Sequence, residues 1–173
     1  MQHKYALPLR ILHWVMAVII IGLIALGLVM GEMERENPLH STLYSMHKSF
    51  GVLIFILFAL RLVFRMRFGA PALPDAVPEL ERKLGHLAHC LLYFMMVAMP
   101  VTGFLMSNYF GFGVNFFGFS IPRPVGIDKE LAGFFGEAHE LLANILIGLI
   151  GLHIAGVVKH WIKEKVNLLK RMV

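Results

Sequence analysis

The fold is decided by an apolar stretch at residues 131–158, which reads LAGFFGEAHELLANILIGLIGLHIAGVV. It is longer than the roughly 20 residues that an α-helix needs to cross about 30 Å of hydrocarbon. His139 and His153 interrupt it, 14 residues apart. At about 100° per residue this spacing falls about 40° short of four full turns, so both imidazoles leave one face, about 21 Å apart along the axis. One transmembrane helix therefore carries two histidines on the same face, one near each membrane surface.

Three further apolar stretches precede this one, at residues 11–31, 49–64 and 84–107. The second is short for a span. We expect its helix to begin near Tyr44, which brings Met46, His47 and Lys48 into the first turn. Residues 1–173 are therefore predicted to form one all-α domain, an integral membrane four-helix bundle.

The composition disfavours several classes of protein. Of the 173 residues, 58% are hydrophobic and 16% are charged, and the mean hydropathy is +0.71. About a quarter of the residues in soluble domains are charged, so a cytosolic enzyme or a disordered regulator does not fit. The single cysteine, Cys90, excludes an intrachain disulfide and a Cys-x-x-Cys-His haem attachment. Any haem is then held noncovalently.

The distribution of Lys and Arg predicts the orientation of the spans. These residues cluster in the short flanks of the apolar stretches, which is typical of a membrane protein rather than of a nucleic-acid-binding one. Most of them lie near the two termini and at residues 61–83, and only four lie on the other side: Arg35, Lys48, Arg123 and Lys129. By the positive-inside rule, both termini are predicted to face the cytoplasm.

Two connections differ in character. Residues 68–81, FGAPALPDAVPELE, contain several prolines and are predicted to form an irregular cytoplasmic loop. Residues 109–124, YFGFGVNFFGFSIPRP, interleave aromatic residues with glycine. We expect this segment to lie in the outer membrane interface, where aromatic rings are favoured.

Histidines at matching depths indicate two binding sites, because ionisable residues in spans are costly and mark function. His47 is expected beside His139 on the outer side, and His13 beside His153 on the inner side. Two imidazoles on one iron give a six-coordinate b haem that is suited to electron transfer. His86 and His89 lie at the level of His13, and the spacing leaves open whether one of them completes the inner site instead.

Short segments spread over the whole chain carry a resemblance to a known family. They are Lys4-Tyr5, LRILHW at 9–14, MHKSFG at 46–51, RLVFRMR at 61–67, GHLAH at 85–89, MPVTG at 99–103, HELLAN at 139–144 and GLIGLH at 148–153. In this order and spacing they resemble the bacterial cytochrome b561 proteins, which are related to the cytochrome b subunits of nickel-iron hydrogenase and formate dehydrogenase.

The resemblance implies two noncovalent b haems with axial ligands from helices one, two and four. These ligands correspond to His13, His47, His139 and His153 in this chain. His86 and His89 are thereby removed from ligation and, with His160, become candidates for quinone binding or proton delivery, since histidine titrates near neutral pH. Arg10 and Lys159 are expected to pair with the propionates of the inner haem.

The resemblance also implies an activity. Standalone members of the family resemble superoxide oxidases, which pass electrons from periplasmic superoxide through the haems to ubiquinone. An entry site for an anion should be cationic, and we expect Lys48, Arg35 and Arg123 to supply it. Seven acidic residues lie on the same side: Glu32, Glu34, Glu36, Asp128, Glu130, Glu137 and Glu140.

The sequence therefore predicts a dihaem b-type cytochrome of the bacterial inner membrane, an oxidoreductase that transfers electrons from superoxide to ubiquinone. Its expected partners are membrane lipid, quinone and a small redox donor or a partner redox protein, and not nucleic acid. The alternative is a membrane-anchor subunit that takes electrons from a partner dehydrogenase or a periplasmic cytochrome. A third class, a haem-free structural or transport bundle, predicts no Soret absorption.

Overall fold

Four long helices make up most of the chain in a computed structural model that describes residues 4–34, 36–74, 76–163 and 165–173. They are α1 (Leu7–Gly31), α2 (His40–Phe68), α3 (Glu79–Tyr109) and α4 (Lys129–Lys163). All four are long and apolar enough to cross a membrane. The predicted all-α membrane bundle is therefore confirmed. α2 begins at His40 rather than near Tyr44, because its polar first turns extend the helix beyond the apolar stretch.

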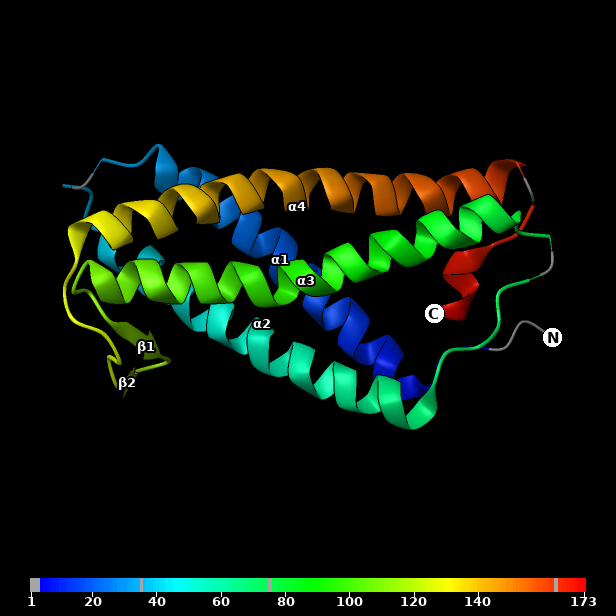
Figure 1. The fold of residues 1–173 in the computed structure, drawn as a ribbon, viewed down its shortest axis with the longest axis horizontal. Helices are drawn as coiled ribbons and strands as arrows, with labels where there is room; N and C mark the ends of the chain where they lie inside the picture. The colour runs from blue at the N-terminus through cyan, green and yellow to red at the C-terminus, as the bar shows by residue number, and fades with distance from the viewer. Residues whose placement is uncertain (1–3, 35, 75, 164) are drawn as a thin grey trace.

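The helices are arranged as two pairs. α3 packs along α4, α1 packs along α2, and α2 also contacts α3, whereas α1 and α4 make at most a sparse backbone contact among the described residues. Figure 1 shows α1 and α2 running obliquely across the α3–α4 pair. A central apolar cluster joins the pairs, with Met16, Ile54, Phe58 and Leu146 buried in it.

A β-hairpin lies at one end of the bundle, which we call the hairpin end. Strands β1 (Val114–Phe116) and β2 (Phe119–Ile121) are antiparallel, with Asn115 opposite Ser120. The turn has positive φ at Phe117 (47°) and Gly118 (96°), the pattern of a type I′ hairpin turn. The sequence predicted that this segment lies in the outer membrane interface but did not predict strands, so the hairpin is an unpredicted feature.

Ser49 fastens the hairpin to α2. Its hydroxyl donates to the carbonyl of Asn115 at 2.9 Å and accepts from the backbone N–H of Phe117 at 3.1 Å. The ring of Phe117 also packs edge-on against Phe50, with 5.3 Å between centroids. A bulky residue at positive φ is strained, and these contacts with α2 hold it there.

The start of α1 and the C-terminal residues lie at the opposite end, which we call the terminal end (Figure 1). A short 3₁₀ helix, η1 (Leu168–Arg171), lies at this end (Figure 1) and contacts α4. Arg171 is buried, and its guanidinium donates to the carbonyls of Pro71 and Ala72 at 2.5 and 2.9 Å. The indole N–H of Trp14 donates to the carbonyl of Met172 at 2.8 Å. These bonds tie the loop between α2 and α3, the start of α1 and η1 together.

Candidate functional site

At the hairpin end, α2 and α4 bring the imidazoles of His47 and His139 close together. Their ring centroids lie 6.3 Å apart and the ring planes are inclined by 74°. Two imidazoles that bind one metal from opposite sides, each through a nitrogen at about 2 Å, have centroids about 6 Å apart. The separation therefore fits two axial ligands of a single metal ion.

His139 is held in place by one turn of α3. Its Nδ1 lies 3.1 Å from the carbonyl oxygen of Met99 and 3.1 Å from the hydroxyl oxygen of Thr102. Since a carbonyl oxygen only accepts, Nδ1 carries the proton and Nε2 keeps its lone pair for a ligand. A Cβ on Gly103 would lie 3.0 Å from Cε1 of His139, a tight contact that would require the imidazole or α3 to shift.

His47 has a different environment. Its Nδ1 is buried and has no hydrogen-bond partner among the described residues, which is uncommon for a buried polar atom. A Cβ on Gly27 of α1 would lie 3.5 Å from Cε1 of His47, an ordinary contact distance. In the hairpin-end pair, therefore, α3 orients the imidazole of His139 through hydrogen bonds at Nδ1. Nδ1 of His47 makes no such bond to the described residues.

At the terminal end, α1 and α4 bring His13 and His153 together with the same spacing. Their centroids are 6.3 Å apart and their planes are inclined by 68°. A third imidazole, that of His89 on α3, lies 5.3 Å from His153 and nearly perpendicular to it, at 89°. Its Nδ1 is 2.6 Å from the carbonyl oxygen of Gly85, one turn earlier in α3. The His89–His153 spacing is shorter than that of either pair.

Each pair would supply two ligands to a metal, so a six-coordinate metal needs four further donors. Among the described residues, no group of three or more His, Cys, Asp or Glu side chains is placed to hold a metal ion. A porphyrin supplies four equatorial nitrogens and leaves two axial positions for imidazoles. The two pairs therefore fit the axial ligands of haem better than they fit a bare metal site.

The remaining histidines of the terminal end have separate partners. Nε2 of His86 lies 3.7 Å from Sγ of Cys90 on the same helix. Nδ1 of His160 lies 3.5 Å from a carboxylate oxygen of Glu81. Lys159 also forms an ion pair with Glu81, which ties α4 to α3. Of the three residues predicted to bind quinone or deliver protons, only His89 contacts one of the paired histidines.

The two residues predicted to bind propionates differ. Lys159 already has the Glu81 carboxylate as its partner. Nε of Arg10 is buried and makes no hydrogen bond to the described residues. A buried guanidinium donor without an acceptor suits an anionic group of a bound molecule, so Arg10 fits the expected role better than Lys159.

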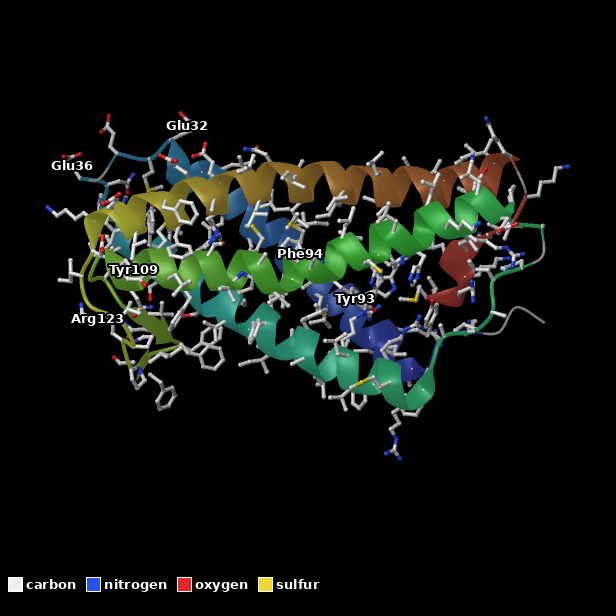
Figure 2. All side chains as sticks on the ribbon, viewed as in Figure 1. Glu32, Glu36, Tyr93, Phe94, Tyr109 and Arg123 are labelled. Atoms are coloured by element: carbon white, nitrogen blue, oxygen red, sulfur yellow. The ribbon has the colours of Figure 1, made fainter. Side chains whose placement is uncertain are left out.

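Two cationic side chains at the hairpin end, those of Lys48 and Arg123, reach the backbone of residues 111–113. Lys48 Nζ donates to the hydroxyl of Ser107 at 3.2 Å and to the carbonyl of Gly113 at 3.1 Å. Arg123 reaches the carbonyl of Gly111 with 3.4 Å between donor and acceptor. The structure thus brings Lys48 and Arg123 to residues 111–113, while Arg35 lies outside the described residues. Figure 2 shows Glu32 and Glu36 at this end but on the opposite edge from Arg123.

Sequence reasoning missed the residues that surround the paired histidines. Met99, Thr102 and Gly103 support His139, and Gly27 faces His47. The only signal was a Pro-Val-Thr-Gly run inside an apolar span. Proline, threonine and glycine are tolerated in membrane helices for many reasons, so the run alone does not indicate which helix face meets a histidine.

Comparison with known proteins identifies the family of the chain. A profile of the family described as prokaryotic cytochrome b561 matches residues 4–173. Cytochrome b561 homolog 2 of Escherichia coli K12 is 30% identical over 98% of this chain and 91% of that protein. Cytochrome b561 homolog 1 of the same strain is 26% identical over 94% and 92%. The probable superoxide oxidase CybB of Yersinia pestis is 25% identical over 100% and 97%.

The match to the profile covers all but the first three residues, and the relatives are covered almost end to end. Family membership implies a bacterial membrane protein that transfers electrons and binds b-type haem. The chain belongs to the prokaryotic cytochrome b561 family.

Proposed function

We propose that the chain is a dihaem cytochrome b that oxidises superoxide on one side of the membrane and reduces ubiquinone at the other. The observation that carries the proposal is the presence of two histidine pairs with the same 6.3 Å centroid separation, both of which take one member from α4. In this proposal His47 and His139 hold one haem, and His13 and His153 hold the other. When bound, the haems supply reversible one-electron chemistry.

The overall reaction balances with two donors and one acceptor. Two superoxide anions each lose one electron and become O₂, and the two electrons with two protons convert one ubiquinone into ubiquinol. The relative from Yersinia pestis is a probable superoxide oxidase, which supports this donor. The hairpin end is proposed to face the periplasm, since the Lys- and Arg-rich flanks surround the terminal end.

Lys48 and Arg123 are proposed to attract superoxide to the hairpin end. Both cations lie on residues 111–113, and Lys48 directly follows His47 in α2. A local positive potential raises the concentration of a small anion and its encounter rate. The acidic residues Glu32 and Glu36 occupy the other edge (Figure 2), so negatively and positively charged side chains lie on opposite edges of this end. Arg35 is kept as a third candidate on sequence grounds.

At the terminal end, His89 is the residue best suited to protonate the quinone. It contacts His153 from α3, and in this proposal it lies beside the inner pair rather than in it. Its Nδ1 is engaged with Gly85, which leaves Nε2 to face a ligand. His86 and His160 also lie at the terminal end. They are proposed to pass protons from the cytoplasm to His89.

A second candidate function rests on the acidic edge of the hairpin end. Glu32, Glu36 and their neighbours would repel superoxide but attract a cationic redox protein. The chain would then be the membrane anchor of a partner dehydrogenase or of a periplasmic cytochrome.

One experiment separates these functions. The chain is purified in detergent, its b haem per polypeptide is measured by pyridine haemochrome and reduced-minus-oxidised spectra, and ubiquinone reduction is followed after a superoxide pulse. Two haems and unaided quinone reduction support the proposal. Two haems without reduction favour the anchor function, and an absence of Soret absorption from folded protein contradicts both.

A further inference from the structure

The strongest remaining feature is the hydrogen bonding of one histidine, His139. Among the described residues, none of the other three paired histidines makes a ring hydrogen bond, and Nδ1 of His47 is buried without a partner. His139 alone has two oxygens at hydrogen-bond distance from Nδ1, both supplied by α3. The hairpin-end and terminal-end pairs therefore differ in the hydrogen bonding of one ring nitrogen, Nδ1 of His139.

The direction of each proton follows from the chemistry of the groups. The hydroxyl of Thr102 lies 2.8 Å from the carbonyl oxygen of Ala98 and 3.0 Å from that of Met99. Both oxygens only accept, so the hydroxyl donates its one proton to these carbonyls, of which Ala98 is the nearer. The Thr102 oxygen then presents a lone pair to the N–H of His139, at 3.1 Å. The carbonyl of Met99 is a second acceptor for the same proton, also at 3.1 Å. His139 Nδ1–H is shared between two oxygens, and Thr102 is itself polarised by a carbonyl.

We propose that Thr102 is a positioning residue that fixes the tautomer of His139 and makes its Nε2 a stronger electron donor. The inference rests on the proposed ligation by His139. An acceptor on Nδ1–H draws that proton away from the ring and raises the electron density on the other nitrogen, which favours ferric over ferrous iron. Thr102 therefore lowers the reduction potential of the outer haem, the one proposed to be held by His47 and His139. It leaves unchanged the potential of the inner haem, which is proposed to be held by His13 and His153.

The surroundings of Thr102 also favour its hydrogen bond to His139. Gly103 follows it, and the absence of a Cβ there lets the ring of His139 approach α3. Thr102 is half-buried, so water competes weakly for the same proton. The neighbouring Met99 contributes only a backbone oxygen, which substitution cannot remove, so Thr102 holds the only replaceable acceptor of Nδ1–H among the described residues.

The test compares Thr102→Ala with Thr102→Ser in full-length, haem-loaded protein. These variants differ only by the hydroxyl, and Thr102→Val adds a variant of nearly native shape. Spectroelectrochemical titration follows each haem, which is assigned from His139→Ala and His153→Ala spectra. In the Ala and Val variants, the ferrous-to-ferric ratio of the outer haem at a fixed ambient potential should rise by about tenfold, the usual size of an outer-shell effect. This corresponds to about 59 mV for one electron.

The Ser variant should restore the native ratio of the outer haem, and the inner haem should not respond to any of the three changes. Selective loss of the outer haem from the Ala variant but not from the Ser variant would also support the inference. Equal outer-haem potentials in the Ala and Ser variants would overturn it, and so would equal shifts of both haems. Lack of haem in the native protein would overturn the proposed function and the inference together.

Discussion

The hairpin-end and terminal-end histidine pairs share one geometry but differ in their surroundings. Both have centroids 6.3 Å apart, with planes inclined by 74° and 68°. Beside the hairpin-end pair, α3 contributes a hydroxyl, a carbonyl and a glycine. Beside the terminal-end pair, the same helix contributes a third imidazole, that of His89. One helix thus gives fixed hydrogen-bond acceptors to one pair and a further imidazole to the other. The proposed function assigns electron transfer alone to the first end and quinone reduction to the second.

The largest expected effect comes from removing one ligand of each pair. His139→Ala should abolish binding of the outer haem only, and His153→Ala of the inner haem only, because each lost imidazole leaves one iron with a single protein ligand. Haem per polypeptide should fall from two to one in each variant. His40→Ala, which changes a histidine that stacks on Tyr44, is the control and should keep both haems. Loss of the same haem from both variants would refute the pairing.

His89→Leu sharpens the difference between the two ends. Both haems should remain, but ubiquinone reduction should slow by about 100-fold, since general acid catalysis contributes about 10²–10⁴-fold. The rate is measured with chemically reduced protein and excess quinone. His86→Leu is the comparison and should have the smaller effect, because its ring contacts Cys90 rather than a paired histidine. If His89→Leu loses the inner haem, His89 is a ligand and the assignment of His13 is wrong.

Gly103→Ala tests the steric side of the comparison. The new methyl would lie 3.0 Å from Cε1 of His139, and overpacking of this kind costs about 1–3 kcal/mol. Retention of the outer haem should weaken by roughly tenfold, which competition with apomyoglobin would measure. Gly148→Ala on α4 is the control, because its Cβ would meet no described atom within 4 Å. Equal haem retention in the two variants would remove Gly103 from the support of His139.

Lys48→Glu has the smallest expected effect. It should slow superoxide oxidation severalfold and weaken its dependence on ionic strength, because a local attractive potential is reversed. Lys48 also fastens Ser107 and Gly113, so Arg123→Glu, whose exposed side chain makes one long bond to Gly111, provides a cleaner second variant. Stopped-flow rates at several salt concentrations are the measurement. Unchanged rates in both variants would exclude these cations from the entry path.

The four helices and the membrane depths of the paired histidines were predictable, because apolar length and a 3.6-residue period are properties of single segments. His139 and His153 lie on one face of α4 for this reason, and the structure sets His47 and His13 opposite them. The hairpin was not predictable, since its turn places Phe117 at positive φ, where aromatic residues are rarely found. The bond between Thr102 and His139 depends on how α3 is rotated against α4, and no period within one helix encodes that rotation.

The position of α4 in the chain has a consequence for biosynthesis. It supplies a histidine to each pair, yet it is the last of the four long helices to leave the ribosome. A nascent chain that has inserted α1, α2 and α3 holds His13 and His47 without their partners. In the proposed dihaem arrangement, cofactor capture has to follow translation of residue 139 for one site and of residue 153 for the other, so the hairpin-end site can be completed first.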